Sequence, residues 1–215
     1  MSNINNVEIL ELMASKICHD LISPVGAISN GVEIMEELGG EVDSDIINLI
    51  AFSSTQANAK LKTMRLAYGV GGSDTNIKPQ DVHEIFGEYL SGENRLSQDW
   101  NPNTDIATEQ KEGFAKMLML CLMLVIDALP KGGVISAKSD GDNVTVISGK
   151  GDNAHFRDGY LHALENKTPS DQLSPKLIHA YITGLLARNY GFEITIDESE
   201  NNFIFLRLKS TPVSL

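Results

Sequence analysis

Long apolar stretches, cysteines and basic residues are scarce in this sequence. The longest strongly apolar run, Met117 to Ile126, has about ten residues, roughly half of what a membrane-spanning helix needs. Two cysteines cannot build a disulfide framework, so we expect reduced thiols in a cytoplasmic protein. Lys and Arg number 17 against 29 Asp and Glu, which gives a formal net charge of −12. Such a surface repels nucleic-acid phosphates and anionic lipid, so we expect binding to neither.

The N-terminal residues carry no positive charge ahead of an apolar core, which is not typical of a secretion signal. Instead, apolar residues recur every three or four positions over residues 7–38 and again over residues 46–67, which predicts two long amphipathic helices. Gly39-Gly40 ends the first helix, and the short link predicts an antiparallel hairpin. A lone hairpin leaves most of its apolar stripe exposed. We therefore expect two copies to pair as a four-helix bundle in a homodimer.

Pro24 lies inside the first predicted helix, five residues after His19. A proline there removes one backbone hydrogen bond and clashes with the preceding turn, at a cost of about 3 kcal/mol. We expect a kink near Asp20 and Leu21, held by tertiary packing.

The remainder of the chain alternates between predicted helices and strands. A glycine-rich and polar stretch over residues 71–78 predicts a linker. After it come a helix, a strand, a helix from Glu109 to Leu129, two strands, a helix and two strands. The fold class predicted is α+β. Residues 1–70 form the helical hairpin, and residues 79–215 form an α/β sandwich with helices on one face of one sheet.

One motif in the first helix carries specific chemistry: His19-Asp20-Leu21, then one residue, then Ser23-Pro24. This pattern resembles the H-box of dimeric histidine kinases. The continuation PVGAISNGVEIM resembles ChpT-type histidine phosphotransferases, relatives of those kinases. The resemblance covers essentially the whole chain and is most specific at residues 19–24. It implies a phosphorelay protein that shuttles phosphate between receiver-domain aspartates through His19 without binding ATP, with Asp20 as the acidic residue beside the histidine.

The residue types fit that chemistry independently. Imidazole is both a good nucleophile near neutral pH and a good leaving group. Asp20 can accept a hydrogen bond from one ring nitrogen of His19, which fixes the tautomer. Lys16, one turn earlier, and Ser23, one turn later, share the face of His19. We expect Lys16 to attract the phosphoryl group and Ser23 to donate a hydrogen bond to it.

Other readings of this region are weaker. Cys18 and His19 are adjacent on a helix and cannot both face one metal ion, so a packed, inert thiol is expected at Cys18. The other four histidines lack metal-ligand spacing, and we expect no metal site.

The second half resembles a nucleotide-binding domain of the Bergerat type whose ligands are lost. Residues 125–133 resemble the end of the helix that presents Mg²⁺-binding asparagines in active kinases. On that alignment Leu120 and Leu124 stand at the asparagine positions, and leucine cannot ligate Mg²⁺. Ser148 replaces the aspartate that contacts adenine. The short SGKG run at residues 148–151, which follows a predicted strand, is weak evidence for a phosphate loop. We expect a degenerate domain kept as a scaffold, with no cofactor bound by this chain.

The resemblance also implies partners. A receiver domain, carrying its own Mg²⁺, is expected to cover the His19 face and to contact Leu12 and Ile22 on the exposed side of the bundle. The family's partners are the receiver of a hybrid kinase of the CckA kind and regulators of the CtrA and CpdR kind, in alphaproteobacterial cell-cycle control.

Two alternatives stay open. One is a divergent ATP-dependent histidine kinase or phosphatase, against which Leu120 and Leu124 argue. The other is a non-catalytic protein that sequesters a regulator through the same fold.

Overall fold

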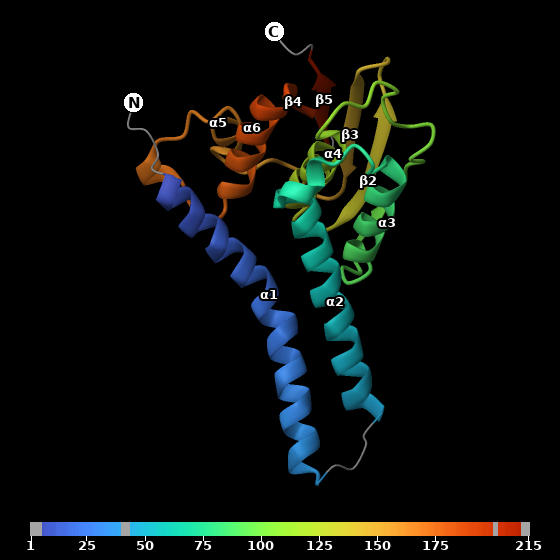
Figure 1. Ribbon diagram of the computed structural model, residues 1–215, viewed down its shortest axis with the longest axis vertical. Helices are drawn as coiled ribbons and strands as arrows, with labels where there is room; N and C mark the ends of the chain where they lie inside the picture. Colours follow the sequence, from blue (N-terminus) through green and yellow to red (C-terminus); the bar gives the residue numbers. More distant parts are fainter. Residues whose placement is uncertain (1–5, 40–43, 200–201, 212–215) are drawn as a thin grey trace.

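The computed structural model describes residues 6–39, 44–199 and 202–211 and has an α+β fold. Helices α1 (Asn6–Glu37) and α2 (Ser44–Tyr68) form an antiparallel hairpin that extends away from the rest of the chain (Figure 1). The two helices approach closely at Gly31, where a Cβ atom would lie only 2.6 Å from Cγ1 of Ile50. The hairpin predicted from the sequence is therefore present.

Helix α1 runs through Pro24 without ending, and the proline is buried. The helix changes direction about midway along its length (Figure 1), and Pro24 lies inside it. This bend agrees with the expected effect of a proline within a helix. Packing of α1 against α2 and against the second half of the chain holds the interrupted helix together.

The second half begins with the short 3-10 helix η1 (Val70–Ser73). The elements that follow are α3 (Pro79–Leu90), β1 (Leu96–Gln98), α4 (Phe114–Asp127), β2 (Gly133–Ser139), β3 (Val144–Lys150), α5 (Tyr160–Leu164), η2 (Ser170–Gln172), α6 (Ile178–Tyr190), β4 (Phe192–Ser199) and β5 (Phe203–Ser210). Helix α4 starts later than the predicted Glu109, because Gly113 adopts a left-handed conformation with φ of 81° immediately before it.

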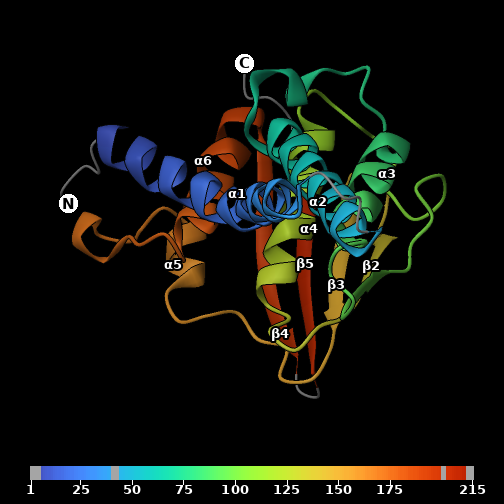
Figure 2. The ribbon, with the colours of Figure 1, turned by 90° about the horizontal axis from the view of Figure 1, so that it is seen from below.

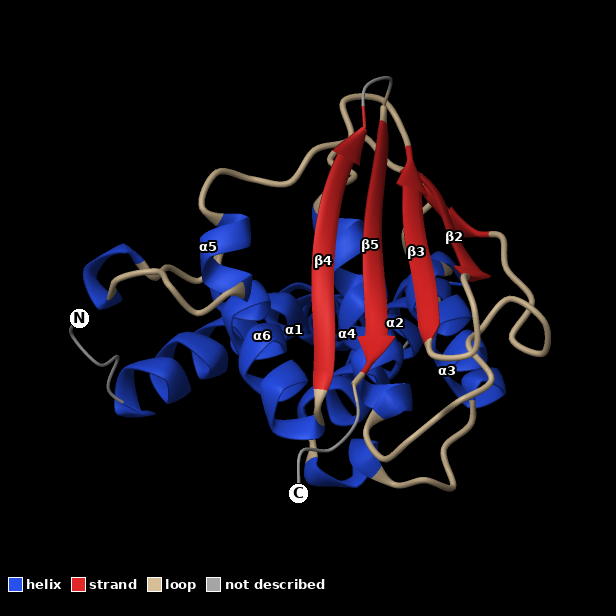
Figure 3. Cartoon of the chain, turned by 90° about the horizontal axis from the view of Figure 1, so that it is seen from above, coloured by secondary structure: helices blue, strands red, loops and turns tan. Residues whose placement is uncertain are grey.

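The five strands form one sheet in the order β1-β2-β3-β5-β4. The pair β1–β2 is parallel, and the other pairs are antiparallel. Helices cover one face of the sheet and leave the other open (Figures 2 and 3). Side chains alternate accordingly: Ile135, Ile147 and Leu206 are fully buried beneath the helices, and their neighbours along each strand point outward. The result is a two-layer α/β sandwich.

Helix α4 contains the apolar run noted in the sequence and lies at the centre of the core. Every residue from Phe114 to Val125 is buried. The helix packs on the sheet on one side and on α2, α3 and α6 on the others, so it is apolar all round rather than along one stripe. Among the helices that the structure describes, none is long and apolar enough to cross a membrane.

Lys116 is a charged residue inside this apolar helix. It is 1% exposed, and burial lowers the pKa of its ammonium group. Its Nζ donates to the backbone oxygens of Ala67 and Gly69, at 3.2 and 2.6 Å, with a longer 3.4 Å contact to Leu66. The Leu66 and Ala67 carbonyls lie in the last turn of α2, where no helical N–H follows to bind them, and Gly69 comes directly after the helix. Lys116 therefore joins the end of the hairpin to the core.

Replacing Lys116 with Met should lower the free energy of unfolding by about 1–3 kcal/mol, because it leaves the buried Ala67 carbonyl oxygen without its side-chain donor, whereas the Gly69 carbonyl still accepts from the Gly72 N–H. Urea denaturation followed by circular dichroism measures this change. The exposed Lys138→Met is the control and should leave the midpoint nearly unchanged. Equal stability of wild type and Lys116→Met would contradict this role.

Candidate functional site

His19 projects from the middle of α1 into solvent. Its side chain is 87% exposed. The ring atom Nδ1 lies 3.4 Å from Oδ1 of Asp20, so an Nδ1–H group can donate a long hydrogen bond to that carboxylate. In this tautomer Nε2 carries the free lone pair and faces outward. The geometry thus leaves one ring nitrogen free to act as a nucleophile.

Asp20 is held more firmly than His19. Its Oδ2 accepts a hydrogen bond from Nζ of Lys16 at 2.8 Å, one helical turn earlier. Both side chains are about three-quarters buried, at 23% and 24% exposed. The Lys16 ammonium therefore already has a carboxylate partner in Asp20, and its expected contact with a phosphoryl group stays a prediction.

A cavity of about 470 Å³ opens beside the histidine. The hairpin contributes Ser15, Lys16, His19 and Asp20 to its lining, and the second half contributes Asp127, Arg157, Pro175 and Lys176. The cavity thus brings three cationic side chains together with two carboxylates in a chain of strongly negative net charge. Such a local excess of positive charge favours an anionic group near His19.

Sequence reasoning missed the part of this lining that comes from the second half. Arg157 and Lys176 lie on connections between elements, and nothing in their local sequence marks them. Asp127 gives a faint signal, because it is an acidic residue at the last position of the otherwise apolar helix α4. Only the packing of α1 against the second half brings these residues to His19.

Asp127 is anchored from its own side of the cavity. Its Oδ2 accepts hydrogen bonds from the Tyr160 hydroxyl at 2.8 Å and from Nδ1 of His179 at 3.2 Å. Burial by itself raises the pKa of the Asp127 carboxyl, whereas the hydrogen bond and the charge of His179 lower it. Lys16 and Tyr160 act in the same direction, so the pKa lies below its ordinary value.

The remaining predicted contact residues are placed differently from one another. Ile22 is 72% exposed, close to the histidine on α1, and Ser23 is also exposed. Leu12 was expected on the outer side of the bundle, and that expectation is wrong: Leu12 is half-buried and packs against the core of the second half. The first turns of α1 pack on that half of the chain, so Ile9, Leu12 and Met13 contact its core. Cys18 is exposed, not packed as expected.

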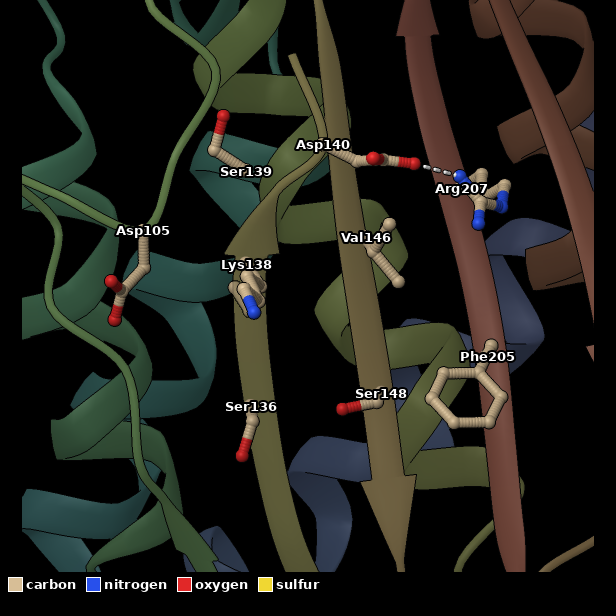
Figure 4. Close-up of a pocket in the computed structure, with 10 residues that line it drawn as sticks. Asp105, Ser136, Lys138, Ser139, Asp140, Val146, Ser148, Phe205 and Arg207 are labelled. Atoms are coloured by element: carbon tan, nitrogen blue, oxygen red, sulfur yellow. Dashed lines mark hydrogen bonds and ion pairs between the residues drawn. The ribbon is translucent and has the colours of Figure 1, made fainter.

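The expected nucleotide-ligand positions do not face this cavity. Leu120 and Leu124 are fully buried in the core. Ser148 lies in β3 and lines a second cavity of about 470 Å³ on the open face of the sheet, where Asp140 pairs with Arg207 (Figure 4). In the described part of the chain, no cluster of three or more His, Cys, Asp or Glu side chains is suited to hold a metal ion.

Comparisons with known proteins agree with this architecture. A family model described as the histidine phosphotransferase C-terminal domain matches residues 79–202. The chain is 32% identical over 198 residues to protein phosphotransferase ChpT of Brucella abortus (strain 2308), covering 90% of this chain and 92% of that protein. A solved structure of a bacterial phosphotransferase aligns with a TM-score of 0.78 and 28% identity, covering 96% of this chain and 98% of that one.

The Asp127→Asn variant should be less stable than the wild type at neutral pH, by about 1–2 kcal/mol, since it removes a charged acceptor from two donors. A folded-state pKa below the unfolded value means that ionised Asp127 stabilises the fold above the ordinary carboxyl pKa of about 3.9. This contribution is lost as the pH falls through the folded-state pKa. Urea denaturation at several pH values measures the difference.

The exposed Asp152→Asn serves as the control and should leave the urea midpoint at neutral pH close to that of the wild type. A gap between wild type and Asp127→Asn that widens on acidification would contradict the role assigned to the carboxylate.

Proposed function

This chain belongs to the histidine phosphotransferase family, and we propose that it carries a phosphoryl group on His19 from one receiver domain to another. The observation that carries the proposal is the placement of His19: its ring is 87% exposed, and its Nδ1 faces the Asp20 carboxylate. With the proton on Nδ1, beside Asp20, the Nε2 lone pair is free to act as the nucleophile.

The chemical step needs little from the protein beyond position. Nε2 of His19 attacks the phosphorus of a receiver phosphoaspartate in line, forming an N–P bond as the P–O bond to the aspartate breaks. The aspartate leaves as a carboxylate, so no proton has to move. The contact between Nδ1–H and Asp20 stabilises the positive charge that develops on the ring. Transfer to the next receiver is the reverse reaction.

The cationic side chains around the cavity support this proposal. Lys16 comes from α1, whereas Arg157 and Lys176 come from the second half of the chain. Together they provide positive charge for a group that carries about two negative charges. Mg²⁺ belongs to the incoming receiver domain, where it neutralises charge during transfer. The exposed Ile22 side chain lies beside the site and offers an apolar contact to that domain.

The expected homodimer is part of the proposal. Exposed apolar side chains lie along both helices of the hairpin, among them Val25, Val32 and Ile34 on α1 and Ile47, Leu49, Phe52 and Leu61 on α2. At about 100° per residue, Leu49 and Phe52 share one face of α2, and Ile47 and Leu61 share the opposite face. Burying the face of the hairpin that carries Leu49 and Phe52 against a second copy would form a four-helix bundle with one His19 from each copy. The dimer would function in the cytoplasm.

We further propose that the chain acts without ATP. Leu120 and Leu124, which align with the asparagines that ligate Mg²⁺ in kinases, lie sealed in the core. The second half then serves as a scaffold that places its side chains beside His19. A receiver of the CckA kind as donor and regulators of the CtrA and CpdR kind as acceptors are the partners that we infer.

Replacing His19 with Gln should abolish acceptance of phosphate from a phosphorylated receiver domain, since the amide is not a nucleophile of comparable strength. Electrophoresis with labelled phosphate follows the transfer. His155→Gln, at another exposed histidine, is the matched control and should transfer normally. Labelling of the wild type by ATP alone would favour a kinase, and receiver binding without any transfer would favour sequestration.

The variant Leu49→Glu/Phe52→Glu should convert a dimer into a monomer, because it places charge on the apolar face of α2 that these two residues form. Light scattering after size-exclusion chromatography reports the mass. Leu161→Glu, on α5 and also half exposed, is the control and should leave the dimer intact. A wild type that is monomeric at micromolar concentration would contradict the proposed bundle.

A further inference from the structure

Pro24 leaves the backbone oxygen of Asp20 without its helical partner. In a regular helix the N–H of residue 24 donates to the carbonyl of residue 20, and proline has no N–H. A partly buried carbonyl without a donor is costly, so a substitute is expected.

The substitute comes from the other helix of the hairpin. Nζ of Lys60, on α2, donates to the Asp20 carbonyl oxygen at 3.1 Å. The Lys60 side chain is partly buried, as is that of Asp20. The break at Pro24 exposes carbonyls much as a helix C-terminus does, and a lysine ammonium is well suited to that position.

With this contact, each of the three oxygens of Asp20 has a partner. Its main chain is bound by Lys60, its Oδ2 by Lys16 at 2.8 Å, and its Oδ1 faces Nδ1 of His19. Because the imidazole is otherwise exposed, its orientation depends on where Asp20 is held. The position of Asp20 depends in turn on the bend in α1.

We propose that Lys60 is a positioning residue for phosphotransfer: its hydrogen bond to the Asp20 carbonyl replaces the one lost at Pro24 and thereby fixes the His19–Asp20 pair. The proposal rests on the function proposed above. The neighbouring Lys62 does not share this role, because its Nζ binds both carboxylate oxygens of Glu88, at 2.9 and 2.7 Å.

A double-mutant cycle tests whether the Lys60 ammonium takes the place of the backbone N–H that residue 24 lacks. Pro24→Ala restores a backbone N–H that can donate to the Asp20 carbonyl, so Lys60 should then become dispensable. Lys60→Met should slow transfer from a phosphorylated receiver domain roughly tenfold in the wild-type background, through misplacement of the imidazole. In the Pro24→Ala background the same change should alter the rate by less than about twofold.

Two further variants keep the test specific. Lys60→Arg retains a donor of similar length and should preserve most of the rate, whereas Lys62→Met should leave the rate near that of the wild type. Unfolding measurements on every variant identify any that fails to fold, and Lys60→Arg then decides the outcome. An equal loss of rate in both backgrounds, or no loss in either, would overturn the proposal.

An independent readout separates this proposal from the proposed function. Long-range ¹H–¹⁵N NMR reports the tautomer of His19 without any receiver. Lys60→Met should move the ring from predominantly Nδ1–H toward a mixture of tautomers, and Pro24→Ala should suppress that change. If no receiver phosphorylates the wild type, the proposed function fails. An unchanged tautomer in Lys60→Met would show that the positioning proposal fails.

Discussion

The environment of His19 depends on Asp20, each of whose three oxygens has its own partner. The backbone oxygen is bound by Lys60, one carboxylate oxygen by Lys16, and the other faces His19. A proline in the same helix makes the first of these contacts necessary, because it removes the ordinary donor. A residue that is unfavourable inside a helix thus makes the Lys60 contact necessary, and that contact is made to the residue whose carboxylate faces His19.

The second half of the chain supports this turn from outside. Helix α4 anchors the core and presents Lys116 to the end of α2 and Asp127 to the cavity beside His19. The anchoring of Asp127 by Tyr160 and His179 gives that carboxylate a fixed place and a lowered pKa. A domain whose expected nucleotide positions are filled by buried leucines therefore still shapes the site, through the side chains that it places against the hairpin.

Much of this architecture could be predicted from the sequence. Helical periodicity, the Gly39 stop and the proline rule predict the hairpin and its bend, and strand signals predict the sheet, since these features depend on local chemistry. His19 and Asp20 follow from a compact motif. Arg157, Lys176 and Lys60 could not be predicted, because their roles depend on contacts between elements far apart in the chain. Leu12 was misplaced for the same reason: periodicity shows an apolar face but not which neighbour covers it.

We propose that Asp20 holds the proton on Nδ1 of His19 and leaves Nε2 to take the phosphoryl group. Long-range ¹H–¹⁵N and ³¹P NMR of the phosphorylated protein, with the modified residue located by mass spectrometry, tests it most directly. We expect a single phosphohistidine at residue 19, with phosphorus bonded to Nε2. Phosphorus on Nδ1, or on a different residue, would contradict it.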